Sequence, residues 1–202
     1  MKMKAQKSNS RKVIMSTMMS VFILSFVACG NNKENSAGEQ SQTPAAKAEV
    51  KAPETDIHTA TFLGDLKSVQ QHIQADSDLN VQEPTMGSTA LISASVFGKT
   101  DIAIALIKAG ADLNIQNNEG STALHSASFL CRTEIVEMLI ANDADKTLKN
   151  IYGFTALDGV MGPWAEIKPI YDEFAKALGP LGLKLDYEQL EETRPLIAEI
   201  LQ

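Results

Sequence analysis

Gly87-Ser88-Thr89-Ala90-Leu91 recurs as Gly120-Ser121-Thr122-Ala123-Leu124, and then, after an equal interval, as Gly153-Phe154-Thr155-Ala156-Leu157. Gly, Thr, Ala and Leu keep the same positions in all three segments. A fixed period of roughly 20–50 residues is the signature of proteins built from stacked structural repeats. The sequence therefore predicts an array in which each copy adds one similar unit to the last.

The interval and the segment Thr122-Ala123-Leu124-His125-Ser126-Ala127 resemble the ankyrin repeat, whose period is about 33 residues and whose hallmark is T-P-L-H-x-A. Ala123 stands in place of the proline. A second landmark is in phase with the first. Gly110-Ala111-Asp112-Leu113-Asn114 resembles the end of a repeat in this family, and Asp143-Ala144-Asp145 follows it at the same interval. The resemblance implies an all-α solenoid of about three to four helix-turn-helix repeats.

The repeats are expected over residues 56–162. The first repeat is truncated, and one extra residue after it falls most simply in the loop Gln82 to Met86. Thr89 stands at an expected helix start, where its hydroxyl can accept a bond from a free backbone amide. Gly98 ends that helix, as a residue able to take positive φ should. Cys131 stands at the same place one repeat later, where a left-handed backbone would cost a side chain on the order of 1 kcal/mol.

After Gly162-Pro163 the sequence leaves the repeat pattern and predicts two longer helices, at Trp164 to Leu178 and at Tyr187 to Leu201. The last repeat of a solenoid must cover its exposed core face with something polar on the outside. We therefore interpret residues 163–202 as a helical C-terminal cap.

The N-terminal residues 1–28 resemble a secretory signal peptide, with a basic segment up to Lys12 and an apolar stretch from Val13 to Ala28. Phe26-Val27-Ala28-Cys29-Gly30 resembles the cleavage box of bacterial lipoproteins, which implies an acylated Cys29 and an anchor in a lipid bilayer. The alternative is a plain signal peptide with an incidental cysteine. Because Gly30 and Asn31 follow the cysteine, the resemblance favours the outer membrane, with the protein facing the periplasm.

Residues 29–55 contain scarcely any large apolar side chain, and such a segment cannot bury enough surface to offset the entropy of ordering it. We expect a flexible tether. The chain carries 18 basic and 25 acidic residues, and five of the basic residues lie in the leader, which leaves 13 against 25. An acidic surface repels phosphate, so no nucleic-acid partner is expected.

Residues that carry chemistry are few. The resemblance implies a structural role for His125, whose family counterpart bonds the backbone of neighbouring loops. Cys131 lies six positions further on, but no positioned acid or oxyanion donor accompanies the pair. His58 and His72 do not have the spacing of zinc ligands. The sequence predicts no catalytic residue, no metal site and no cofactor, with a hydrolase using Cys131 and His125 as a remote alternative.

Three large apolar pairs recur at the ends of the predicted inner helices, where this family has variable residues that face solvent. A solenoid aligns equivalent positions, so we expect a continuous apolar strip for a protein partner. The alternatives are that one member of each pair packs inward, or that the C-terminal cap covers the strip. The predicted partner-binding residues are these pairs and neighbouring loop residues: Phe62, Leu63, Met86, Val96, Phe97, Phe129, Leu130, Tyr152 and Phe154.

These features predict a non-catalytic protein-interaction module, an adaptor or regulator held at a bacterial envelope. The aromatic residues Phe97, Phe129, Tyr152 and Phe154 are the expected anchors, because a few buried aromatic side chains usually dominate an interface. A structural or protective role in the envelope is the alternative.

Overall fold

The computed structural model describes residues 51–202, which belong to one compact unit. Within these residues the chain forms eight α-helices, one short 3₁₀ helix and no strand, which confirms the predicted all-α fold. The signal peptide predicted over residues 1–28, the acylated Cys29 and most of the predicted tether lie outside the described residues. None of the helices within residues 51–202 is long and apolar enough to cross a membrane.

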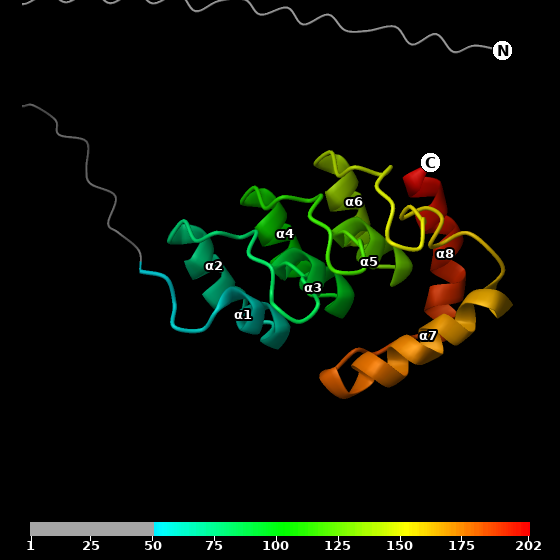
Figure 1. Cartoon of the computed structure of the whole chain (residues 1–202), viewed down its shortest axis with the longest axis horizontal. Helices are drawn as coiled ribbons and strands as arrows, with labels where there is room; N and C mark the ends of the chain where they lie inside the picture. The colour runs from blue at the N-terminus through cyan, green and yellow to red at the C-terminus, as the bar shows by residue number, and fades with distance from the viewer. Residues whose placement is uncertain (1–50) are drawn as a thin grey trace, which may run out of the picture. The chain divides into compact units, whose positions relative to one another are not determined.

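Six short helices form three helix-turn-helix pairs, one for each of the first three repeats. Figure 1 shows the pairs stacked side by side, with the first helices of the pairs in one row and the second helices in another. The pairs are α1 (Ile57–Leu63) with α2 (Leu66–Gln74), α3 (Ala90–Phe97) with α4 (Thr100–Lys108), and α5 (Ala123–Phe129) with α6 (Thr133–Ala141).

Each first helix starts at a side chain that bonds a free backbone amide. Thr89 Oγ1 accepts from the backbone N–H of Ile92 at 3.2 Å, which confirms the predicted N-cap. Asp56 and Thr122 do the same for α1 and α5. Such a bond satisfies one of the donors that a helix start leaves unpaired, and it is worth about 1 kcal/mol.

The turn between the two helices of each pair requires a left-handed residue. Gly64 has φ 76° and Gly98 has φ 61°, as expected for glycine. Cys131 takes the same conformation in the third repeat, with φ 52°. The cysteine that aligns with Gly98 in the sequence thus occupies a left-handed position, at a cost on the order of 1 kcal/mol.

Small and aliphatic side chains fill the space between the two rows of helices. Ala60, Ala94 and Ala127 are fully buried, which allows the first helices to pack closely against one another. Ile102, Leu106, Ile135 and Leu139 complete the core from the second row. Burying one such aliphatic side chain stabilises the fold by about 1.5–3 kcal/mol.

Hairpin loops join consecutive repeats. In the loop Asn117–Ser121 the backbone N–H of Asn117 bonds the carbonyl of Ser121, and in Asn150–Phe154 the equivalent groups bond in the same way. The first hairpin closes between Glu83 and Ser88 and is one residue longer. The extra residue lies inside this hairpin, within the segment Gln82 to Met86 in which the sequence places it.

The fourth repeat contributes a hairpin and a single turn instead of a helix pair, with Ala156 and Val160 buried. Beyond it stand α7 (Trp164–Leu178), the 3₁₀ helix η1 (Gly179–Leu181) and α8 (Tyr187–Leu201). Both long helices have the bounds expected from the sequence.

The last helix, α8, packs against α5 and α6 and buries Leu190, Ile197 and Leu201 in the common core. It covers a side of the third repeat that would otherwise be exposed. The solenoid is thus closed by helices of a different length from those of the repeats.

Candidate interaction surface

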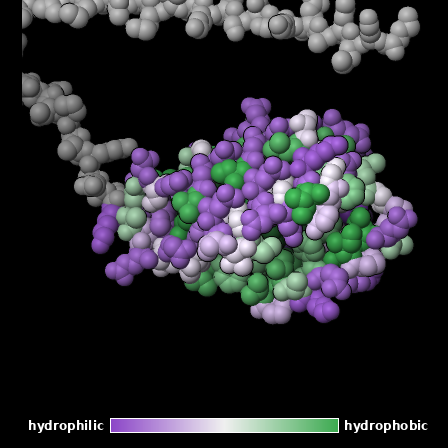
Figure 2. Space-filling view, in the orientation of Figure 1, coloured by the Kyte–Doolittle hydropathy of each residue, from purple (hydrophilic) through white to green (hydrophobic). Residues whose placement is uncertain are grey.

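Apolar side chains at the ends of α1 and α3 remain accessible to solvent. Phe62 is 38% exposed and Leu63 is 68% exposed, while Val96 and Phe97 are half-buried. The rings of Phe62 and Phe97 meet edge to face, with 5.2 Å between their centroids and 86° between their planes. We call these four residues the apolar strip. Figure 2 shows hydrophobic side chains gathered along the lower margin of the molecule, over the ends of α1 and α3 and the adjoining part of α7.

The third pair is not part of this exposed strip. Phe129 stacks on Tyr171 of α7 with 4.5 Å between ring centroids, and it also contacts Phe174 at 5.2 Å. Leu130 is buried, with 2% of its surface exposed. The expectation that Leu130 faces solvent is therefore wrong, because the C-terminal cap packs over the end of the third repeat.

Three of the predicted partner-binding residues stand on the hairpin loops and not on the strip. Met86 is on the first hairpin, and Tyr152 and Phe154 are on the last. All three are exposed, as is Ile151 beside them. Apart from Phe129 and Leu130, the structure therefore divides the predicted binding residues into the apolar strip and a separate group at the loops.

His125 holds its own repeat to the next hairpin. The backbone N–H of Thr122 donates to Nδ1 at 3.2 Å, so Nδ1 is an acceptor and Nε2 carries the proton. Nε2 then donates to the backbone carbonyl of Phe154 at 3.1 Å. Burial lowers the pKa of the imidazole, although the carbonyls of Phe154 and Leu148 act in the opposite direction. His125 is therefore a neutral structural link between neighbouring loops, as the resemblance implied.

Cys131 and His125 do not form a nucleophile and base. The cysteine lies against α8, where Sγ is 3.8 Å from the carbonyl of Leu190, and both imidazole nitrogens of His125 are engaged elsewhere. Burial raises the pKa of the Cys131 thiol to about 11, against which Arg194 and Arg132 act only partly. At neutral pH the thiol is protonated, and only the thiolate is strongly nucleophilic.

The hollow beside Cys131 is too small for a substrate. It has a volume of about 60 Å³ and is lined by Leu130, Cys131 and Arg132 together with cap residues such as Lys184 and Leu190. Ligand pockets usually enclose roughly 300–1,000 Å³. Within residues 51–202 no group of three or more His, Cys, Asp or Glu side chains is placed to hold a metal ion.

Sequence reasoning missed the residues that attach the cap. The buried Arg194 of α8 donates from Nη1 to the hydroxyl of Tyr171 at 3.0 Å and to the carbonyl of Gly159 at 3.3 Å, and Nη2 donates to Met161 O at 3.2 Å. No repeat period marks either residue, because each occurs once in the chain. The only sequence signal for this attachment was a single arginine among the apolar positions of the last helix.

Residues 57–150 match the family model for ankyrin repeats, in three copies. The match covers α1 to α6 and the hairpins between them, and it ends before the cap. Ankyrin repeats indicate a protein-interaction module, and they confirm the architecture that the period of the sequence predicts.

Proposed function

We propose that this chain is a non-catalytic protein-interaction module, anchored to a bacterial envelope through an acylated Cys29. The observation that carries the proposal is the exposed apolar strip of Phe62, Leu63, Val96 and Phe97 on an ankyrin-repeat scaffold. Large apolar side chains that gather on a surface usually mark an interaction site.

The strip is preorganised for binding. Its side chains lie at the ends of capped helices, and the edge-to-face contact of Phe62 and Phe97 restricts both rings. A surface that is already ordered loses little conformational entropy when a partner docks. The partner would therefore present its own apolar side chains to these two rings, with Leu63 as the most accessible contact.

The leader supports the anchoring part of the proposal. A basic segment, an apolar stretch and the box Phe26-Val27-Ala28-Cys29-Gly30 are the features of a lipidated envelope protein. Acyl chains contribute about 0.8 kcal/mol per buried methylene, so several chains on one cysteine would hold the protein at a bilayer. Gly30 and Asn31 favour the outer membrane, where a flexible tether would present the repeats to partners at the same surface.

The proposal is tested with the full-length lipidated chain, captured from solubilised envelopes and compared with a Phe62→Ser/Leu63→Ser variant. Phe129 is left unchanged in this variant, because its ring packs on Tyr171 and Phe174 of α7 and its loss would disturb folding. We expect a dominant partner whose affinity falls at least about tenfold in the variant, since each apolar side chain is worth about 1.5–3 kcal/mol when it is buried at an interface.

Leu196→Ser is the matched control, because Leu196 is an exposed leucine on α8, away from the strip. It should leave capture unchanged. Circular dichroism checks that the wild type and the Phe62→Ser/Leu63→Ser variant are both folded. If both then capture the partner equally, the strip is not the binding surface.

A further inference from the structure

The three hairpins are built alike around one acceptor side chain. Asn117 Oδ1 accepts from the backbone N–H groups of Glu119 and Ser121 at 3.0 and 2.9 Å. Asn150 Oδ1 accepts from Tyr152 and Phe154 at 3.0 and 3.1 Å. Glu83 does this for the longer first hairpin. Equivalent positions on the three hairpins can therefore be compared residue by residue.

Neighbouring hairpins are joined by one repeated backbone bond. Asn118 N–H donates to the carbonyl of Met86 at 2.9 Å, and one repeat later Ile151 N–H donates to the carbonyl of Glu119 at 3.0 Å. We call this row of bonds between hairpins the ladder. Its acceptors are Met86 and Glu119, so the equivalent acceptor one repeat later is the carbonyl of Tyr152. No backbone or side-chain group in residues 51–202 donates to it.

Within residues 51–202, nothing packs closely over the repeated glycine of the last hairpin, in contrast to the other two hairpins. A Cβ added to Gly87 would lie 2.5 Å from the side chain of Asn118, and one added to Gly120 would lie 2.9 Å from the backbone of Ile151. The glycines are thus packed closely against the following hairpin. Gly153 is the equivalent residue of the last hairpin, and a Cβ there would meet nothing within 4 Å.

The opposite end of the ladder is closed. The equivalent donor on the first hairpin is the backbone N–H of Thr85, which bonds Glu83 Oε2 at 2.7 Å. Burial alone would raise the pKa of Glu83. Hydrogen bonds from the backbone N–H groups of Thr85, Ser88 and Met86 outweigh this effect and lower the pKa, so the carboxylate stays charged. Pro84 beside it has no N–H to donate. A charged side chain and a proline protect an edge from pairing with another chain.

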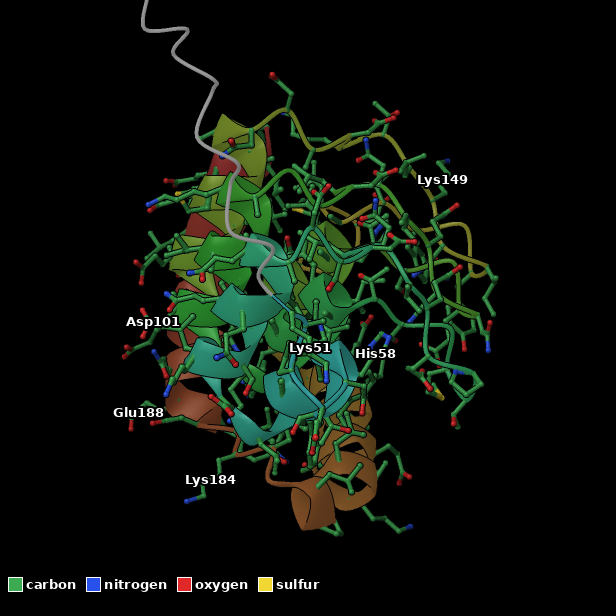
Figure 3. All side chains as sticks on the ribbon, turned by 90° about the vertical axis from the view of Figure 1, so that its left-hand side faces the viewer. Lys51, His58, Asp101, Lys149, Lys184 and Glu188 are labelled. Atoms are coloured by element: carbon green, nitrogen blue, oxygen red, sulfur yellow. The ribbon has the colours of Figure 1, made fainter. Side chains whose placement is uncertain are left out.

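The open end is apolar where the inner hairpin is polar. Asn118, Glu119 and Ser121 of the inner hairpin correspond to Ile151, Tyr152 and Phe154 of the last. These three side chains are 65%, 64% and 53% exposed. A terminal repeat normally turns a polar surface to solvent. Figure 3 shows the hairpins, with Lys149 directly before the last of them, on the side of the helices away from Lys184 and Glu188 of the C-terminal region.

A second copy of this hairpin does not fit the open end. All four N–H groups of Ile151, Tyr152, Gly153 and Phe154 are already bonded, to Glu119 O, Asn150 Oδ1, Asn150 O and Asn150 Oδ1. Two copies of this hairpin would face each other with acceptors only. Head-to-tail stacking is opposed by the closed edge at Glu83 and Pro84. A second copy of the hairpin thus cannot supply the missing donor, whereas an extended segment of a partner protein carries free backbone N–H groups.

We propose that the hairpin Asn150–Phe154 is a docking site for an extended segment of a partner protein, which donates a backbone N–H to Tyr152 O and packs an apolar side chain against Tyr152 and Phe154. Addition of an extended segment to an open edge gains affinity from main-chain bonds and specificity from side chains. This site is separate from the apolar strip, so either can fail without the other.

The test is selection of a phage-displayed library of random dodecapeptides on the full-length chain in detergent. The matched variant is Ile151→Asn/Tyr152→Glu/Phe154→Ser, which gives the last hairpin the residues that already fold into the same turn at Asn118, Glu119 and Ser121. We expect selected peptides to bind the wild type at least tenfold more tightly than the variant, and to bind Phe62→Ser/Leu63→Ser as tightly as the wild type. Methylation of one peptide backbone nitrogen should weaken binding at least tenfold.

A photo-crosslinking amino acid at Tyr152 gives a second readout that does not depend on how the variant folds. It should crosslink the selected peptides, whereas the same amino acid at Leu196 should not. The proposal is overturned if no peptide prefers the wild type, if no backbone methylation weakens binding, or if the wild type dimerises and the variant is monomeric.

Discussion

The hydroxyl of Tyr171 donates a 2.5 Å hydrogen bond to the backbone carbonyl of Phe129, and the two rings stack with 4.5 Å between their centroids. Arg194 donates to the same hydroxyl at 3.0 Å. One chain of polar contacts therefore joins α8, α7 and the end of α5. This relationship closes the third repeat and limits the apolar strip to the first two.

Tyr171→Phe removes this link while keeping the ring. We expect the free energy of unfolding to fall by about 1–3 kcal/mol, because the variant leaves the Phe129 carbonyl and one Arg194 donor without their partner in a buried site. Urea denaturation measures the loss. Tyr152→Phe is the matched control, because the Tyr152 side chain is exposed and it should change stability by less than about 0.5 kcal/mol. Equal stability of Tyr171→Phe and the wild type would contradict a structural role for the hydroxyl.

Arg194→Met tests whether the cap depends on the buried guanidinium. Within residues 51–202 its partners are neutral oxygens, those of Gly159, Met161 and Tyr171, and it forms no ion pair. Loss of hydrogen bonds from a charged donor should lower the free energy of unfolding by at least about 2 kcal/mol. Hydrogen exchange should rise first in α8, the helix that carries the residue.

Arg132→Met is the control for this change. Within the described part of the chain, the Arg132 side chain makes a single hydrogen bond, of 3.4 Å from Nη2 to the carbonyl of Val96. Its replacement should cost less than that of Arg194. A larger loss at Arg132 would show that bond number does not decide how these two arginines contribute.

Repeated features of the fold could be predicted from the sequence, because each recurs at a fixed spacing. The Thr89 N-cap, the left-handed Cys131 and the extra residue in the first hairpin follow from comparing one repeat with the next. The cap could be predicted only as two helices. Where α7 lies depends on a tertiary contact between Phe129 and Tyr171, two residues that no local pattern connects.

The candidate interaction surface also has features that the sequence predicts and others that depend on tertiary contacts. Phe62-Leu63 and Phe129-Leu130 look equivalent in the sequence, yet Leu63 is exposed and Leu130 is buried. The difference arises because the cap packs over the end of the third repeat, where Leu130 lies. Tyr152 and Phe154 could be identified as candidates from residue type, but the open acceptor at Tyr152 O required the hydrogen-bond pattern of all three hairpins.

His125 should make stability depend on pH. Its pKa lies below the ordinary 6.5 in the folded protein because burial disfavours the charged ring, so the unfolded chain takes up a proton more readily. The contribution of the neutral ring is therefore complete above about pH 6.5 and is lost as the pH falls below that value. We expect the difference in unfolding free energy between the wild type and His125→Gln to shrink between pH 7 and pH 5. A constant difference across this range would contradict the prediction.

The Cys131 thiol should be nearly inert in the folded protein. Burial raises its pKa to about 11 from an ordinary 9.0, so at pH 8 the folded state holds about a hundredfold less thiolate than the unfolded chain. A Cys29→Ser variant leaves Cys131 as the only thiol, since the chain has two cysteines. Its reaction with a disulfide reagent at pH 8 should be at least about a hundredfold slower in buffer than in concentrated urea. Fast reaction of the folded protein would mean that Cys131 is accessible and ionised, and would reopen the nucleophile hypothesis for Cys131 and His125.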